Sequence, residues 1–234
     1  MPEESAKTLI IACGALAREI VELTRANGWS AFYVQCLPPE LHNRPERIPA
    51  AVEAQIVAHR DRYREIFVAY GDCGTGGLLD AVLATHGVER LPAAQCYEAL
   101  ASAPVFAELS AAEPGTFYLT DFLLRHFERL VTRGLGLDRH PELASEYFRN
   151  YRRLTYLAQR EQPGALERAR AIASALRLEF HYRFTGYGEL GRALAVLHDR
   201  RARRNADAQA SAHADLRAGA HALSHGARSS AWPL

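Results

Sequence analysis

The chain has 234 residues, of which 48% are hydrophobic and 24% charged, so its composition is that of an ordinary folded domain. Its formal net charge of +1 excludes a general electrostatic attraction to nucleic acid or to an anionic membrane. The apolar run at 8–13 is too short to span a bilayer, and the acidic N-terminal segment is unlike a secretory signal, so a cytoplasmic location is expected.

The first half of the chain alternates short apolar runs with helical patterns. This alternation predicts a parallel sheet with helices on both faces. Fully apolar runs favour strands that are covered on both sides. Strands are expected at 8–13, 30–37, 65–71 and 88–93, and helices at 15–28, 47–63 and 77–87.

The second half is less regular but contains the same kinds of segment. Its elements fit one long sheet or two lobes, 1–112 and 113–204, with a cleft between them. The predicted fold class is therefore α/β, mostly parallel and Rossmann-like. Strands are expected at 116–120, 153–159 and 178–186, and helices at 121–134, 141–151, 163–178 and 188–204.

From residue 205 onward the composition changes to Ala, Ser, His and Arg. A segment with so few large apolar residues buries too little surface to offset the entropy lost on ordering. The sequence therefore predicts that 205–234 is a disordered tail, separate from an α/β domain at 1–204. The irregular spacing of His213, His221 and His225 indicates solvated side chains.

Cysteines follow the expected strands of the first half. Cys13 closes the first strand, Cys36 lies near the end of the second, and Cys73 and Cys96 follow the third and fourth; His42 is in the loop after the second. The carboxyl ends of neighbouring parallel strands meet at one edge of a sheet, ~5 Å apart. Zinc prefers three or four such sulfur and nitrogen ligands. We therefore predict a metal site made of Cys13, His42, Cys73 and Cys96, with Cys36 the weakest candidate because it can point into the sheet.

Two other roles remain open for these thiols. Cys73 and Glu19 are the catalytic candidates: Cys73 could be a nucleophile, and Glu19, one turn into the first helix, could move protons. Alternatively, the cysteines fill space, because cysteine is among the most buried residue types. No CxxC pair is present to favour the metal hypothesis further.

A glycine-rich segment at 70–77 joins a strand directly to a helix. Its residues Gly74, Thr75 and Gly76 could turn backbone N–H groups toward a phosphate, or lower the pKa of a thiol at Cys73. The segment matches neither the P-loop nor the dinucleotide-binding motif. A tight strand-to-helix turn is the alternative.

Polar residues at two other places are candidate ligand contacts. Asn43 follows His42, and Thr120 and Asp121 end a later strand. Asp121 could instead cap the next helix, and a loop histidine such as His42 is often structural or solvated.

Four strings, 13–19, 41–46, 70–76 and 115–120, together with Cys96, resemble an uncharacterised prokaryotic group, the domain-of-unknown-function family sixteen thirty-eight. Members are often encoded near corrinoid-dependent methyltransferases. The resemblance therefore implies a cytoplasmic protein linked to methyl transfer, with a corrinoid protein or a methyltransferase as partner. The chain lacks the corrinoid-binding DxHxxG string, which favours Cys/His ligation of a free metal over a standard B12 module.

Three functional hypotheses follow. The first is a metal- or cofactor-binding protein, with zinc as the default, another metal or a corrinoid left open, and Glu19 and Asp121 orienting the ligands. The second is an enzyme that holds a phosphorylated substrate or nucleotide at 70–77. The third is a non-catalytic partner of a corrinoid protein. Neither a membrane nor nucleic acid is expected as a partner.

Overall fold

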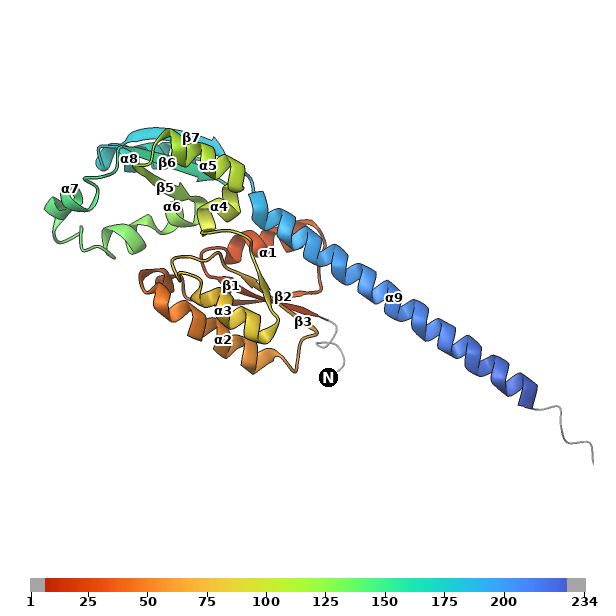
Figure 1. Ribbon diagram of the computed structural model, residues 1–234. Helices are drawn as coiled ribbons and strands as arrows, with labels where there is room; N and C mark the ends of the chain where they lie inside the picture. The colour runs from red at the N-terminus through yellow and green to blue at the C-terminus, as the bar shows by residue number, and fades with distance from the viewer. Residues whose placement is uncertain (1–6, 227–234) are drawn as a thin grey trace, which may run out of the picture. The chain divides into compact units, whose positions relative to one another are not determined.

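The computed structural model describes residues 7–226, apart from the side chains of 212 and 214–226. It contains two sheets in which every strand pairing is parallel, with helices packed against both (Figure 1). This confirms the predicted α/β, Rossmann-like fold class. The chain divides into two compact units, one up to Arg192 and one from Ala193, and both sheets belong to the first.

The first sheet has the strand order β2-β1-β3-β4. All six residues of β1 are buried, because helices cover both faces of this central strand. On one face, Leu9 and Ile11 pack with residues of α2 and α3. The elements are β1 (Thr8–Cys13), α1 (Ala17–Ala26), β2 (Phe32–Leu37), the 3-10 helices η1 (Pro39–Asn43) and η2 (Pro45–Arg47), α2 (Ile48–His59), β3 (Glu65–Ala69), α3 (Leu78–His86) and β4 (Glu89–Arg90).

The strand order places a topological switch point at the carboxyl end of β1, because β2 and β3 lie on opposite sides of β1. Cys13, the last residue of β1, pairs with Leu37 of β2, and Ala12 pairs with Ala69 of β3. The chain therefore crosses from one half of the sheet to the other at β1. In open parallel sheets, ligands bind in the crevice outside the carboxyl ends of the strands at such a point.

The second sheet has the order β5-β6-β7 and its own apolar core, which includes Leu119, Leu154 and Tyr156. Helix α6 continues directly into η3, a turn of π-helix. The elements are β5 (Thr116–Thr120), α6 (Asp121–Phe127), η3 (Glu128–Thr132), the 3-10 helix η4 (Pro141–Leu143), α7 (Ala144–Tyr147), β6 (Arg153–Ala158), α8 (Ala165–Ala175) and β7 (Glu179–Phe184).

Three features differ from the sequence prediction. Two helices that the sequence does not predict, α4 (Cys96–Ala101) and α5 (Ala103–Ala112), join the sheets. Strand β4 has only two residues, although backbone hydrogen bonds continue beyond it, from Asp72 to Ala93 and from Cys73 to Ala94. The carbonyl groups of Leu91 and Ala93 also accept hydrogen bonds from the Arg90 side chain.

The third difference concerns the segment predicted to be disordered. Helix α9 (Gly188–Gly226) continues through 205–226, where the high helix propensity of alanine and arginine supports a helix without a core. The end of that segment, 227–234, and two of its histidines, His221 and His225, lie outside the residues and side chains described; His213 is exposed.

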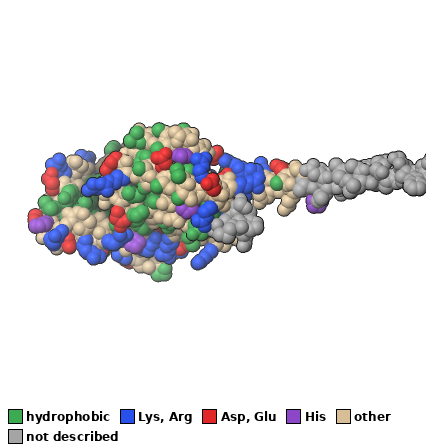
Figure 2. All heavy atoms as spheres, turned by 90° about the horizontal axis from the view of Figure 1, so that it is seen from below, with side chains coloured by type: hydrophobic (Ala, Val, Ile, Leu, Met, Phe, Trp, Pro, Cys, Tyr) green, Lys and Arg blue, Asp and Glu red, His purple; other side chains and the backbone are tan. Residues whose placement is uncertain are grey.

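The surface charge is mixed on the face shown in Figure 2, and no described helix is suited to crossing a membrane. On the face drawn in Figure 2, basic and acidic side chains are interspersed, in keeping with the net charge of +1. Within residues 7–226, no helix combines the length and the apolar character that crossing a bilayer requires.

Candidate functional site

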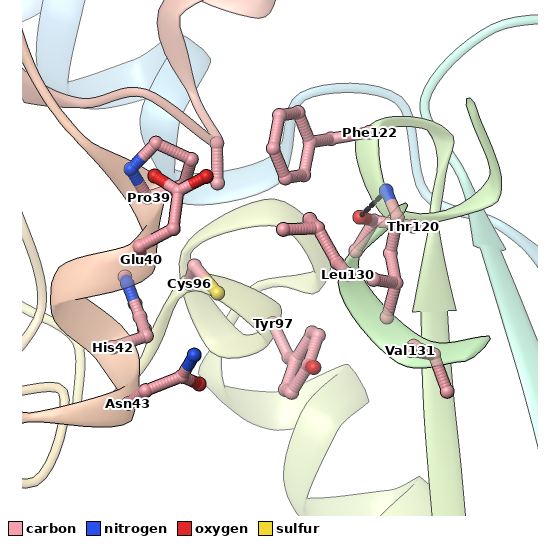
Figure 3. Close-up of a pocket in the computed structure, with 12 residues that line it drawn as sticks. Pro39, Glu40, His42, Asn43, Cys96, Tyr97, Thr120, Phe122, Leu130 and Val131 are labelled. Atoms are coloured by element: carbon pink, nitrogen blue, oxygen red, sulfur yellow. Dashed lines mark hydrogen bonds between the residues drawn. The ribbon is translucent and has the colours of Figure 1, made fainter. Parts of the chain in front are cut away.

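A cavity of about 210 Å³ lies beyond the carboxyl ends of β1, β2 and β5 (Figure 3). Its walls come from the loop after β1, from η1, from the start of α4, and from α6 and η3. Both sheets therefore contribute to it, and it lies where open α/β sheets bind ligands. The polar residues that line it are Glu40, His42, Asn43, Cys96, Tyr97 and Thr120.

His42 and Cys13 form a contact pair at the edge of this cavity. The Cys13 Sγ lies 3.7 Å from His42 Nδ1 and accepts a hydrogen bond from the backbone N–H of Ala15. The Nε2 atom of His42 is buried and has no hydrogen-bond partner among the described residues. Burial lowers the pKa of His42, so its ring is neutral at pH 7. If Nδ1 carries the proton, Nε2 presents a free lone pair.

Cys73 and Cys96 are brought together by backbone packing. The N–H of Cys73 donates to the Ala94 carbonyl at 2.8 Å. A Cβ on Gly71 would lie 2.9 Å from the Ala93 carbonyl oxygen, so glycine is required for this close approach. Cys73 itself has φ +50°, a left-handed conformation that costs energy in a residue with a side chain.

Burial raises the pKa of each of these thiols. The pKa of Cys13 rises to about 12, and those of Cys73 and Cys96 rise for the same reason. All three are therefore protonated at neutral pH, which disfavours Cys73 as a nucleophile unless a positive charge is supplied. Cys13 belongs to the apolar cluster of the first sheet and Cys73 packs against it, so packing is one role that these two thiols fill. Cys36 lies apart, exposed on the edge strand β2.

The glycine-rich turn is filled by one of its own side chains. Asp72 accepts hydrogen bonds from the Thr75 hydroxyl at 2.6 Å and from the N–H groups of Gly76 and Gly77 at 3.1 and 2.9 Å. These bonds, that from Thr75 first, lower the pKa of Asp72, so it is ionised at neutral pH. A phosphate bound at this turn, as the sequence suggests, would have to displace the Asp72 carboxylate from the backbone N–H groups. None of Gly74, Thr75 and Gly76 is among the residues described as lining the cavity.

Glu19 faces the second sheet rather than the thiols. Its Oε1 lies 3.4 Å from Nη2 of Arg125 in α6, and the Glu19 side chain is only 3% exposed. Burial raises the pKa of Glu19. Glu19 Oε2 and Arg125 Nη1 are both buried without a hydrogen-bond partner among the described residues. Glu19 therefore joins the two halves of the compact unit, and its geometry does not pair it with Cys73.

Thr120, and not Asp121, both caps the helix and lines the cavity. Thr120 is the helix cap: its hydroxyl accepts a hydrogen bond from the Leu123 N–H at 3.2 Å, and it also lines the cavity. Asp121 is buried and accepts hydrogen bonds from Tyr156 and Gln162, each at 2.7 Å. Its side chain fixes the carboxyl edge of the second sheet.

The cavity offers donor atoms suited to a metal ion, but the described side chains do not form a complete set of ligands. His42 and Cys96 both line the cavity, and nitrogen and sulfur are the donors that zinc prefers. Among the residues described, however, no three His, Cys, Asp or Glu side chains are grouped closely enough to hold a metal. The predicted four-ligand set is therefore not assembled as it stands.

Several cavity residues escape sequence reasoning. Glu40 and Tyr97 are neighbours of predicted residues, but nothing in their spacing distinguishes them. Phe122, Leu130 and Val131 reach the cavity only because α6 and η3 of the second sheet border the first. A π-helical turn has no clear sequence signal, although such turns are frequent at functional sites.

A family model described as "Protein of unknown function (DUF1638)" matches residues 36–194 of the chain. Because this match covers more than half of the chain, the protein belongs to that family. No curated protein and no solved structure matches it.

Proposed function

We propose that this protein binds a thiophilic metal ion, with zinc as the default, through His42 and Cys96 in the cavity. The observation that carries the proposal is the buried Nε2 atom of His42, which has no hydrogen-bond partner within the described part of the chain, on a ring that lines the same cavity as Cys96. A buried polar atom without a partner is costly, and a bound ligand removes that cost.

Cys13 has a supporting part in this proposal. A ligating histidine usually donates its other ring N–H to a nearby acceptor, which fixes the ring and its tautomer. Two acceptors for that proton lie beside the ring, the Cys13 Sγ at 3.7 Å from Nδ1 and the backbone carbonyl of Pro39. A third protein ligand would come from Cys73, whose side chain would have to turn away from the apolar cluster that it packs against.

With Cys73 as the third protein ligand, a tetrahedral metal would keep one coordination position open for an exogenous group, as in catalytic rather than structural zinc sites. A metal bound there would act as a Lewis acid and lower the pKa of a thiol. The apolar side chains of Phe122, Leu123 and Leu130 would keep water from that group. Thiols are good acceptors of methyl groups, which agrees with the link to methyl transfer that the family resemblance implies.

The size of the cavity limits what it can hold. At about 210 Å³ it is smaller than the pockets that enclose drug-sized ligands, roughly 300–1,000 Å³. A corrin ring does not fit inside it. If the protein acts in corrinoid-dependent methyl transfer, we therefore propose that the cavity binds a small methyl donor or acceptor. The corrin would be bound by a partner protein.

The test is elemental analysis of protein purified anaerobically without a histidine tag. We expect about one equivalent of zinc, cobalt or iron in the wild type. His42→Ala and Cys96→Ser should retain less than about a tenth of it, whereas Cys13→Ser should weaken binding about tenfold or more by chelator competition.

Cys36→Ser is the matched control, because this thiol is exposed on β2 and should leave the metal content unchanged. Circular dichroism would establish that each variant is folded. Metal-free wild type that also fails to bind added zinc or cobalt, or full metal content in folded His42→Ala, would overturn the proposal.

A further inference from the structure

The cavity has one charged wall. Of the side chains described as lining it, Glu40 is the one that belongs to an Asp, Glu, Lys or Arg residue. The Glu40 Oε1 atom accepts a hydrogen bond from the Arg129 guanidinium, as in a carboxylate–guanidinium ion pair. Any ligand that enters this cavity therefore meets a negative charge at one side.

Aromatic and apolar groups border the rest of the cavity. Figure 3 shows the Phe122 ring projecting from α6 toward the space that Glu40 borders from η1, with Cys96 and Tyr97 contributed by α4. A carboxylate and aromatic faces around a small space are the combination that binds organic cations, through charge pairing and cation–π attraction.

A cation already occupies the place beside this carboxylate. The guanidinium of Arg129, in η3, donates a hydrogen bond to Glu40 Oε1. Arg129 itself is not among the residues that line the cavity. Both side chains are about half exposed, at 49% and 48%, and exposed pairs of this kind are weak. A ligand cation could therefore replace Arg129 at little cost.

We propose that the cavity binds a small organic ammonium ion, held between the Glu40 carboxylate and the Phe122 ring, in exchange for Arg129. The inference rests on the proposed function in that it names the ligand class of the same cavity. The volume of about 210 Å³ restricts the ligand to a compact cation such as an ammonium ion bearing short alkyl groups. Its substituents would extend toward Cys96 and His42, where the proposed metal site lies.

Isothermal titration calorimetry with tetramethylammonium chloride tests this inference on the full chain at low ionic strength. Pivalate and tert-butanol, which have a similar shape but a negative charge and no charge, are the ligand controls. Tetramethylammonium should bind saturably, and each control compound should bind at least about tenfold more weakly.

The variants give a pattern that a purely structural role would not produce. Glu40→Gln should weaken binding of tetramethylammonium about tenfold or more, and Phe122→Leu about threefold. Arg129→Gln should strengthen it about two- to fivefold, since the competing internal cation is gone. Arg133→Gln is the matched control, because Arg133 follows the same turn and pairs with Glu128, away from the cavity lining.

Equal binding of pivalate or tert-butanol, weaker binding in Arg129→Gln, or unchanged binding in folded Glu40→Gln would overturn the inference. The titration is run with and without a chelator, so its outcome is separate from that of the metal analysis. Metal content that depends on His42, without binding of tetramethylammonium, would refute the inference and leave the proposed function standing. If the protein binds no metal but tetramethylammonium binding follows the predicted variant pattern, the proposed metal binding is refuted and the inference about the cation stands.

Discussion

Replacing Tyr156 with phenylalanine tests whether the buried network around Asp121 holds the carboxyl edge of the second sheet. The Tyr156 hydroxyl donates to Asp121 Oδ1 at 2.7 Å, and the two residues are each only 1% exposed. Burial raises the pKa of Tyr156, so its hydroxyl keeps its proton and donates throughout the working pH range. The substitution removes one donor and leaves the rest of the ring in place.

The expected loss follows from the state of the carboxylate left behind. Asp121 Oδ2 keeps its hydrogen bond from Gln162, but Oδ1 loses its partner in a site that water does not reach. A hydrogen bond to a charged group, or a buried acceptor left unsatisfied, is worth about 1.5–3 kcal/mol. For a protein of this size we expect a fall in Tm of roughly 3–12 °C.

Urea denaturation followed by circular dichroism is the assay, and the midpoint should fall while the m-value stays constant. Tyr182→Phe is the matched control. Tyr182 lies on the adjacent strand β7 with its ring 5.8 Å from that of Tyr156, but it is 41% exposed, so its loss should cost less than about 0.5 kcal/mol. If the Tyr156→Phe midpoint coincides with that of the control, the network does not stabilise the fold as argued.

Two further predictions concern the first sheet. Asp72→Asn should lower the free energy of unfolding by about 0.5–1 kcal/mol at pH 7, since it weakens the three hydrogen bonds in a partly exposed turn. Because the folded-state pKa of Asp72 is lowered, this stabilisation is present above the ordinary pKa of Asp and is lost as the pH falls through the folded-state pKa. The stabilities of wild type and variant should therefore converge in acid, and parallel pH–stability curves would contradict the reasoning. In native protein, a thiol reagent should modify Cys36 first and Cys13 only on unfolding, because Cys36 is exposed while Cys13 is 1% exposed with a pKa of about 12. Mass spectrometry of the labelled peptides would show this order, and rapid labelling of Cys13 in the folded state would refute it.

Much of the fold could be predicted from local pattern, because strand and helix periodicity are properties of neighbouring residues. The apolar runs at 8–13 and 65–71 became the paired strands β1 and β3, and each of the seven expected strands has a counterpart among the described elements. The prediction was less accurate where tertiary contacts override local preference. At β4 only two residues form regular strand, and the carbonyls of Leu91 and Ala93 that follow also accept hydrogen bonds from the Arg90 side chain. Helices α4 and α5 are short and irregularly patterned, so no periodic signal identifies them.

The candidate site divides in the same way. That residues following parallel strands would meet at one edge of the sheet follows from topology, and it placed His42 and Cys96 in one cavity. Topology does not determine which side chains at that edge face the cavity and which form hydrogen bonds within the protein. Asp72 fills the turn that its glycines seemed to offer to phosphate, and Glu19 turns toward Arg125.

The sequence by itself determined the class of fold, the parallel connections and the edge at which chemistry is to be sought, since these depend on periodicity and chain order. Only the tertiary structure decided which thiols are buried, that His42 Nε2 lacks a hydrogen-bond partner among residues 7–226 as described, and that Glu40 and Phe122 border one cavity. The physical reason is that burial and electrostatic partnership arise between residues far apart in the chain. Arg129 and Glu40 are 89 positions apart, and no local pattern encodes their contact.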